Sequence, residues 1–143
     1  MAVIVEHRYS EAIHPFHAVL LAGTIPLFLG ALICDITYGR TFHIQWSNFA
    51  SWLLVGGMIF TSLALIFAIV DLARAHRRAR GIGLYTLLLV ATWICGLLAA
   101  FWHARDAWAM MPGGLILSAI TTVLACVATW LGFNARRVRR TTV

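Results

Sequence analysis

The sequence predicts an all-α integral membrane protein, a four-helix bundle in which residues 1–143 form a single transmembrane domain. Hydrophobic residues make up 62% of the chain and charged residues only 11%, and the mean hydropathy is +0.87. Soluble proteins carry about 25% charged residues. Four apolar runs each have about the 20 residues that a helix needs to cross a bilayer. None shows the apolar/polar alternation of a membrane β-barrel.

The first helix is expected from about Pro15 to about Tyr38, because proline is well tolerated in the first turn of a helix. Pro26 lies inside this run and is expected to kink it near the middle of the membrane. The polar residues 39–45 predict a loop. The remaining helices are expected at about 47–72, 83–103 and 113–133.

The arginines predict how the bundle is oriented. Of the eleven, only Arg40 and Arg105 lie in the two connections within the hairpins; the rest lie near the termini or in the central connection. Positively charged loops stay in the cytoplasm, so both termini and the central connection are expected there. The net charge of +6 then faces anionic lipid headgroups. The expected partner of these residues is the lipid bilayer and not nucleic acid.

Small residues indicate which helix faces pack together, because helices in lipid approach closely where side chains are small. They recur every four residues from Ala18 on the first helix and from Ala91 on the third. Continuing either spacing reaches a histidine, so His14 and His103 are both expected to point into the bundle. Each half of the chain is a hairpin that ends in an arginine run, which hints at a duplication, although no residue-by-residue repeat is evident.

The sequence carries few of the patterns that mark an enzyme or a pump. No Asp, Glu, His, Lys or Arg lies at mid-depth of the four runs, where pumps and coupled transporters place such groups. No nucleophile–base pair, phosphate-binding loop or zinc motif occurs. We therefore expect no catalytic residue and no metal site, and favour a non-catalytic or electron-transfer subunit over an enzyme.

The first candidate cofactor site lies toward the expected periplasmic face. His103 and His43 come from different segments, as do the histidines that ligate b-type haem in helical bundles. Arg105 could meet haem propionates or a quinone carbonyl, and Trp108 could wall a flat ring. The structural alternative is that His103 only hydrogen-bonds Asp106 and fixes the loop.

The second candidate site lies at the cytoplasmic end. His14 and His17 are three residues apart and share one helical face, where they could grip a haem edge. The alternative is that these imidazoles lie at the interface and bond Asp71. Asp35, at the other end of the first helix, is expected to form an interfacial ion pair with Arg40.

Several short motifs resemble the bacterial membrane family called domain-of-unknown-function 2231. They are His14-Pro15-Phe16-His17, Asp35 and Asp71 at the ends of two helices, and His103-Ala104-Arg105-Asp106-Ala107-Trp108 running into Pro112-Gly113-Gly114-Leu115. The resemblance covers about 14–133 and implies a four-helix inner-membrane protein. Many members carry a histidine at the start of the third helix, where this chain has Gly81-Ile82-Gly83.

The resemblance also implies a context, because such relatives are often encoded beside periplasmic quinoprotein sugar or aldehyde dehydrogenases. The predicted function is a small membrane subunit or anchor of a larger redox or respiratory assembly, with other membrane or periplasmic subunits as partners. In one version it passes electrons from a periplasmic dehydrogenase toward quinone through haem b. The alternatives are a purely structural or assembly subunit without a cofactor, and a transporter of a small solute.

Overall fold

The computed structural model describes residues 14–74, 81–105 and 107–134, and over these residues the chain is helical with no strand. The four long helices are α1 (Pro15–Thr41), α2 (Ile44–Arg74), α3 (Ile82–His103) and α5 (Gly113–Asn134). They contain 27, 31, 22 and 22 residues, and each is long and apolar enough to cross a membrane. The predicted all-α, multi-pass membrane architecture is confirmed.

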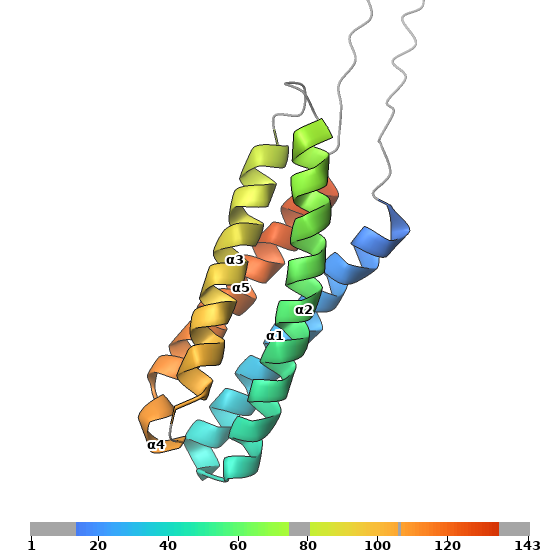
Figure 1. The fold of residues 1–143 in the computed structure, drawn as a ribbon. Helices are drawn as coiled ribbons and strands as arrows, with labels where there is room; N and C mark the ends of the chain where they lie inside the picture. The colour runs from blue at the N-terminus through green and yellow to red at the C-terminus, as the bar shows by residue number, and fades with distance from the viewer. Residues whose placement is uncertain (1–13, 75–80, 106, 135–143) are drawn as a thin grey trace, which may run out of the picture.

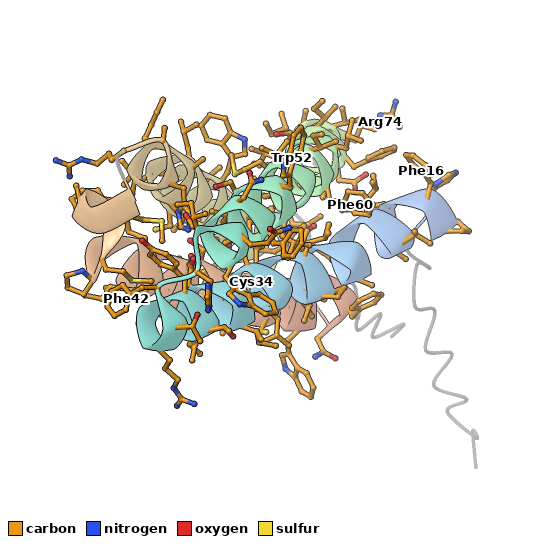
Figure 2. The ribbon with its side chains drawn as sticks, turned by 90° about the horizontal axis from the view of Figure 1, so that it is seen from below. Phe16, Cys34, Phe42, Trp52, Phe60 and Arg74 are labelled. Atoms are coloured by element: carbon orange, nitrogen blue, oxygen red, sulfur yellow. The ribbon has the colours of Figure 1, made fainter. Side chains whose placement is uncertain are left out.

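The four long helices run alternately up and down (Figure 1). Each packs mainly on two others, so that α1 lies against α2 and α5, and α3 lies against the same two. α1 and α3 are therefore diagonal to each other across the bundle. Figure 2 shows Phe42 at one end of the α1–α2 hairpin, with Phe16 and Arg74 at the other end.

The first connection is shorter than predicted. The sequence indicated a loop over 39–45, but α1 continues to Thr41, and only Phe42 and His43 separate it from α2. Phe42 adopts a left-handed conformation with φ of 54°, and its N–H bonds the Tyr38 carbonyl at 2.8 Å. This bond closes the last turn of α1 and reverses the chain at once.

The second connection within a hairpin contains a short helix, α4 (Ala107–Met110), where the sequence predicted only a loop. The side chain of Met110 is fully buried. α4 therefore caps one end of the bundle.

The core follows a regular spacing. Seven of the nine buried positions on α1 advance by alternate steps of four and three residues, and five of the six on α3 do the same. This is the 3.5-residue repeat of helices that pack side by side over their whole length. The α1 positions are His17, Leu21, Thr24, Phe28, Ala31, Asp35 and Tyr38; those of α3 are Tyr85, Leu89, Thr92, Gly96 and Ala99.

This spacing corrects one expectation. The four-residue series on α1 does not stay on one face, because each step of four turns about 40° beyond a full circle. Ala22 and Pro26 are exposed and so is His14, whereas Cys34 is buried. From Cys34 back to His14 the drift is about 200°, and His14 consequently points away from the core.

Pro26 lies within α1, which the structure shows as one continuous helix. Proline leaves the carbonyl of the residue four positions earlier without its usual N–H donor. One residue before that carbonyl, the Leu21 carbonyl accepts bonds from the hydroxyls of Thr24 and Thr129, at 2.7 and 3.2 Å. Hydroxyl groups from α1 and α5 thus supply hydrogen bonds beside the proline.

Candidate functional site

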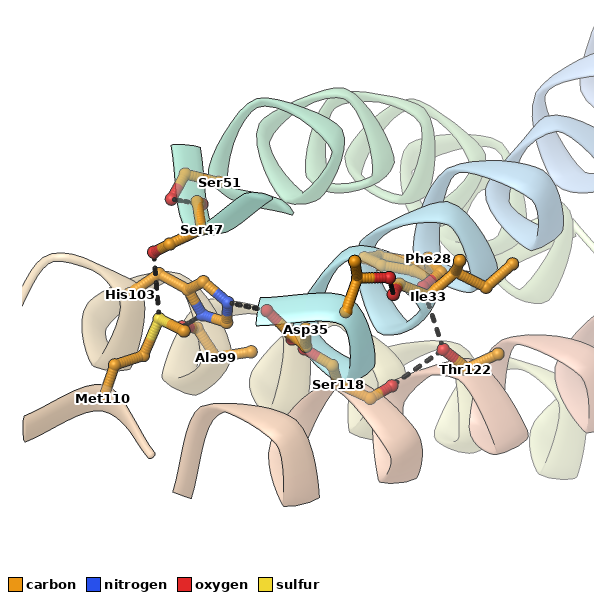
Figure 3. A network of polar contacts seen from close by, with 11 residues as sticks. Phe28, Ile33, Asp35, Ser47, Ser51, Ala99, His103, Met110, Ser118 and Thr122 are labelled. Atoms are coloured by element: carbon orange, nitrogen blue, oxygen red, sulfur yellow. Dashed lines mark hydrogen bonds and ion pairs between the residues drawn. The ribbon is translucent and has the colours of Figure 1, made fainter. Parts of the chain in front are cut away.

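A buried acid–imidazole cluster lies at the end of the bundle that holds α4 (Figure 3). The side chains of Asp35 and His103 are 0% and 1% exposed, and His103 Nε2 lies 2.8 Å from Asp35 Oδ1. Asp35 Oδ2 accepts a hydrogen bond of 2.5 Å from the Ser118 hydroxyl. The cluster therefore joins three helices, α1, α3 and α5.

The hydrogen bonds of His103 limit where protons lie in this cluster. His103 Nδ1 is 2.8 Å from the carbonyl oxygen of Ala99. A carbonyl can only accept, so Nδ1 must carry a hydrogen. One further proton lies between Nε2 and Asp35, as an imidazolium–carboxylate pair or as an imidazole–carboxylic acid pair. In both forms the pair has no net charge, which is how an acid can be buried at low cost.

Neighbouring residues shape the space around His103. A Cβ atom at Gly114 would lie 3.2 Å from the imidazole Cε1, so the glycine at this position lets α5 approach the ring. On the other side, the Ser47 hydroxyl of α2 donates to the sulfur of Met110 at 3.3 Å. α2 and α4 thus close the cluster from two further directions.

Trp102 stands out among the buried polar groups of the described residues. Its Nε1 atom is buried and has no hydrogen-bond partner. The indole lies against Gly113, where any side chain would overlap it. The guanidinium of Arg105 sits over the indole ring, 4.8 Å from its centroid, a cation–π contact.

A second polar cluster lies at the opposite end of the bundle. His17 is 2% exposed, and its Nε2 lies 2.9 Å from the Tyr85 hydroxyl of α3. Its Nδ1 is 3.9 Å from Asp71 Oδ2 of α2. Phe67 stacks on both His17 and His14, with ring centroids 5.4 and 6.2 Å apart. The sequence-based alternative placed both imidazoles at the interface and bonded to Asp71; in the structure His17 is buried and lies at an ion-pair distance from Asp71, whereas His14 is exposed.

The middle of the bundle is lined by hydroxyl groups that bond locally. Five threonine hydroxyls, with at least one on each long helix, donate to carbonyls three or four residues earlier on the same helix, at 2.7–2.8 Å. They belong to Thr24, Thr61, Thr92, Thr121 and Thr122. Each of these hydroxyl groups therefore has a hydrogen-bond acceptor in the backbone of its own helix.

The structure brings together only some of the predicted site residues. His103 is buried, but its partners are Asp35 and Ala99, whereas His43 is exposed beside the first turn. Arg105 is exposed over Trp102. The side chain of Trp108 and the whole of Asp106 lie outside the described residues, and so does any bond between Asp106 and His103.

At the other end the two predicted histidines separate. His17 is buried and bonded, whereas His14 is exposed. The expected ion pair of Asp35 with Arg40 is wrong, because Asp35 is completely buried against His103 while Arg40 is exposed.

Three important residues were not singled out from the sequence as site residues: Asp35, Ser118 and Tyr85. Asp35 carried a usable signal, because an acid within an apolar helix needs a buried partner. A partner on a different helix cannot be read from spacing along one helix. Ser118 and Tyr85 are common residues in membrane helices and carried no signal.

Four membrane-spanning helices and buried acid–imidazole contacts between them define a multi-pass membrane protein. The family model described as "Predicted membrane protein (DUF2231)" matches residues 13–143, and the chain belongs to this family. No curated protein matches the sequence. No solved structure matches it either.

Proposed function

We propose that this protein is a small membrane-embedded subunit or anchor of a larger redox assembly and acts through contacts with other subunits. The observation that carries the proposal is that the buried polar groups at both ends of the bundle hydrogen-bond to one another. Asp35 and His103 bond one another at the α4 end, and His17 bonds Tyr85 at the opposite end. Such internally satisfied groups hold helices together and leave little chemistry for a substrate.

The lipid-facing surface supports the same proposal. Trp52 on α2 and Trp130 on α5 are 70% and 72% exposed, among many exposed aliphatic side chains. The connection between α1 and α2 has only two residues. A partner must therefore meet this chain mainly within the bilayer or at the bundle ends. Exposed aromatic side chains are common anchors in such contacts.

The haem version of the proposal fits the described residues poorly. A bis-histidine haem needs two imidazole nitrogens free to face the iron from different segments. Both ring nitrogens of His103 are already bonded, and His43 and His14 are exposed on the outside of the bundle. We derive no electron-transfer step through a haem from this arrangement.

A quinone headgroup is the second candidate, favoured by one observation. Quinone carbonyls need hydrogen-bond donors, not a free imidazole nitrogen. Arg105 is exposed at the α4 end, where its guanidinium can donate hydrogen bonds. Replacing Arg105 by Gln should then weaken quinone-dependent electron flux, with Arg40→Gln as the control cation at the same end.

The test of the subunit proposal is photocrosslinking in native membranes from two exposed positions, Trp52 and Trp130. The two positions lie on different helices and so face different surroundings. A photoreactive residue at one of them should capture a protein with redox absorption bands, and a photoreactive residue at the other should capture mainly lipid. Substituting alanine at the capturing position should release that protein in mild detergent. If both positions yield only lipid adducts and the purified chain runs as a bare monomer, the proposal is wrong.

A further inference from the structure

Two hydrogen bonds cross the bundle between α1 and α3, and both join residues separated by the same number of positions. His17 bonds Tyr85 at 2.9 Å at one end, and Asp35 bonds His103 at 2.8 Å at the other, each with a sequence separation of 68. The two bonds lie 18 residues apart along each helix, which is five turns and about 27 Å. Helices α1 and α3 are thus in register over the full thickness of the hydrocarbon.

The same offset of 68 positions relates residues of α1 and α3 that lie between these two hydrogen bonds. At mid-depth, a Cβ atom on Gly96 would lie 3.6 Å from the ring of Phe28, and these residues are again 68 apart. Between these contacts, three pairs of buried residues have the same offset and are identical in type: Leu21 and Leu89, Thr24 and Thr92, Ala31 and Ala99. A residue-level repeat therefore exists along α1 and α3, and it is clearest at buried positions.

Helices α2 and α5 repeat with this offset too. Thr61 and Thr129 are identical and both buried, and small residues occupy the corresponding positions Ala50 and Ser118. Other buried pairs with this offset are Leu54 and Thr122, Gly57 and Ala125, and Ala64 and Gly132. In the alternating bundle, α1 runs parallel to α3 and α2 runs parallel to α5 (Figure 1). A half-turn about the bundle axis thus exchanges the two hairpins.

We infer that the chain is a fused pair of duplicated hairpins, 14–74 and 81–134, related by a pseudo-two-fold axis along the membrane normal. Each hairpin presents a docking face whose partner is the other hairpin. Equivalent residues meet near the axis, and in three layers they are unlike: an acid with an imidazole, a large ring with a glycine, an imidazole with a phenol.

These unlike pairs make the docking selective. Two copies of the first hairpin would place Asp35 against Asp35 and Phe28 against Phe28. Two buried carboxylates repel and two rings overfill the space. Two copies of the second hairpin would place His103 against His103 and leave an empty layer at Gly96. The axial residues therefore favour pairing within one chain over association of like hairpins.

The pseudo-symmetry predicts that the acid and the imidazole can exchange places. The ring of His103 needs a carbonyl four residues earlier, which Ala99 supplies. For a histidine at position 35, the equivalent residue is Ala31, which is also a fully buried alanine. The swap is therefore Asp35→His with His103→Asp.

The hydroxyl that bonds the acid must move with it. Ser118 donates to Asp35, and its equivalent on α2 is the fully buried Ala50. The complete exchange adds Ala50→Ser and Ser118→Ala to the swap. One neighbour is left unmatched, because the equivalent of Gly114 is Trp46, so stability should return only in part.

The test compares thermal unfolding and monomer yield of the full chain in mild detergent. Asp35→His alone and His103→Asp alone place like groups on the axis and should each lower the melting temperature by about 10 °C. The fourfold exchange should recover more than half of that loss. If it is no more stable than the worse single variant, the two positions are not equivalent and the inference fails.

A second measurement does not depend on tolerance of the swap. In a chain whose native cysteines are replaced by alanine, paired cysteines at 24 and 92, or at 21 and 89, should join under copper-phenanthroline oxidation. The matched control is 19 and 87, which have the same offset but are 64% and 63% exposed on opposite outer faces. Absence of the inner cross-links, or equal cross-linking of the outer pair, would overturn the axis.

Discussion

The ring of Phe28 on α1 occupies the space that a side chain at Gly57 on α2 would need: a Cβ atom there would lie 2.6 Å from the ring. The ring is fully buried and also touches the surface of Gly96 on α3. Three helices thus converge on one phenyl group at mid-depth. Since lipid gives helices no hydrophobic drive to associate, such close packing is a main source of stability.

The first prediction concerns this contact. Gly57→Ala should destabilise the bundle by about 1–3 kcal/mol, because the added methyl group overlaps a ring that has no room to move. Gly83→Ala is the control, since no atom lies within 4 Å of a Cβ at that position. Unfolding in detergent monitored by tryptophan fluorescence measures both variants. Equal stability of the two would show that Phe28 can be displaced freely.

The second prediction concerns the buried acid. Asp35→Ala removes the partner of the imidazole of His103 and of the Ser118 hydroxyl, and should destabilise the protein by about 3–5 kcal/mol. Asp35→Asn keeps an acceptor oxygen and should lose less. Asp71→Asn, in the partly exposed cluster at the other end, is the control. A loss from Asp35→Ala that matches this control would show that the buried pair contributes little.

The third prediction separates the two histidines of α1. His17→Ala removes a buried side chain and its bond to Tyr85, so we expect a loss of about 2–3 kcal/mol. His14→Ala affects an exposed ring that stacks on Phe67, and should change stability by no more than about 0.5 kcal/mol. The same unfolding measurement ranks them. The reverse order would mean that His14, not His17, anchors this end.

The fourth prediction concerns membrane orientation. A cysteine at His43, in a chain without native cysteines, should react with a membrane-impermeant maleimide added to intact cells, because this exposed turn is expected in the periplasm. A cysteine at Arg74, at the opposite end of α2, should react only after the membrane is permeabilised. If only the cysteine at Arg74 is labelled in intact cells, the orientation is the opposite of the expected one.

Hydropathy and length were sufficient to predict the four helices. In lipid the backbone N–H and C=O groups of each apolar run must hydrogen-bond within the run, and a helix achieves this. The inward face of α1 was predicted wrongly. Small residues at four-residue spacing were extended to His14 without allowing for the drift of the helix, whereas the buried series passes through His17 and Asp35.

The candidate site was less accessible from sequence, for a different reason. His103 was found because it follows the buried Ala99 by only four residues. Its partner Asp35 lies on the diagonal helix, and which residues meet across a bundle depends on the register between helices. That register becomes visible only once the repeat at the buried positions is known, because most lipid-facing residues differ between the halves.

The contact between Asp35 and His103 also limits how strongly this buried pair can respond to voltage. A full charge crossing the membrane is worth about 2.3 kcal/mol per 100 mV. A proton that passes between these two groups moves within a contact of 2.8 Å, about a tenth of the 30 Å hydrocarbon, and the pair stays neutral. The work done by the field is then at most about 0.2 kcal/mol per 100 mV. An energised membrane therefore does almost no work on the proton shared by this pair.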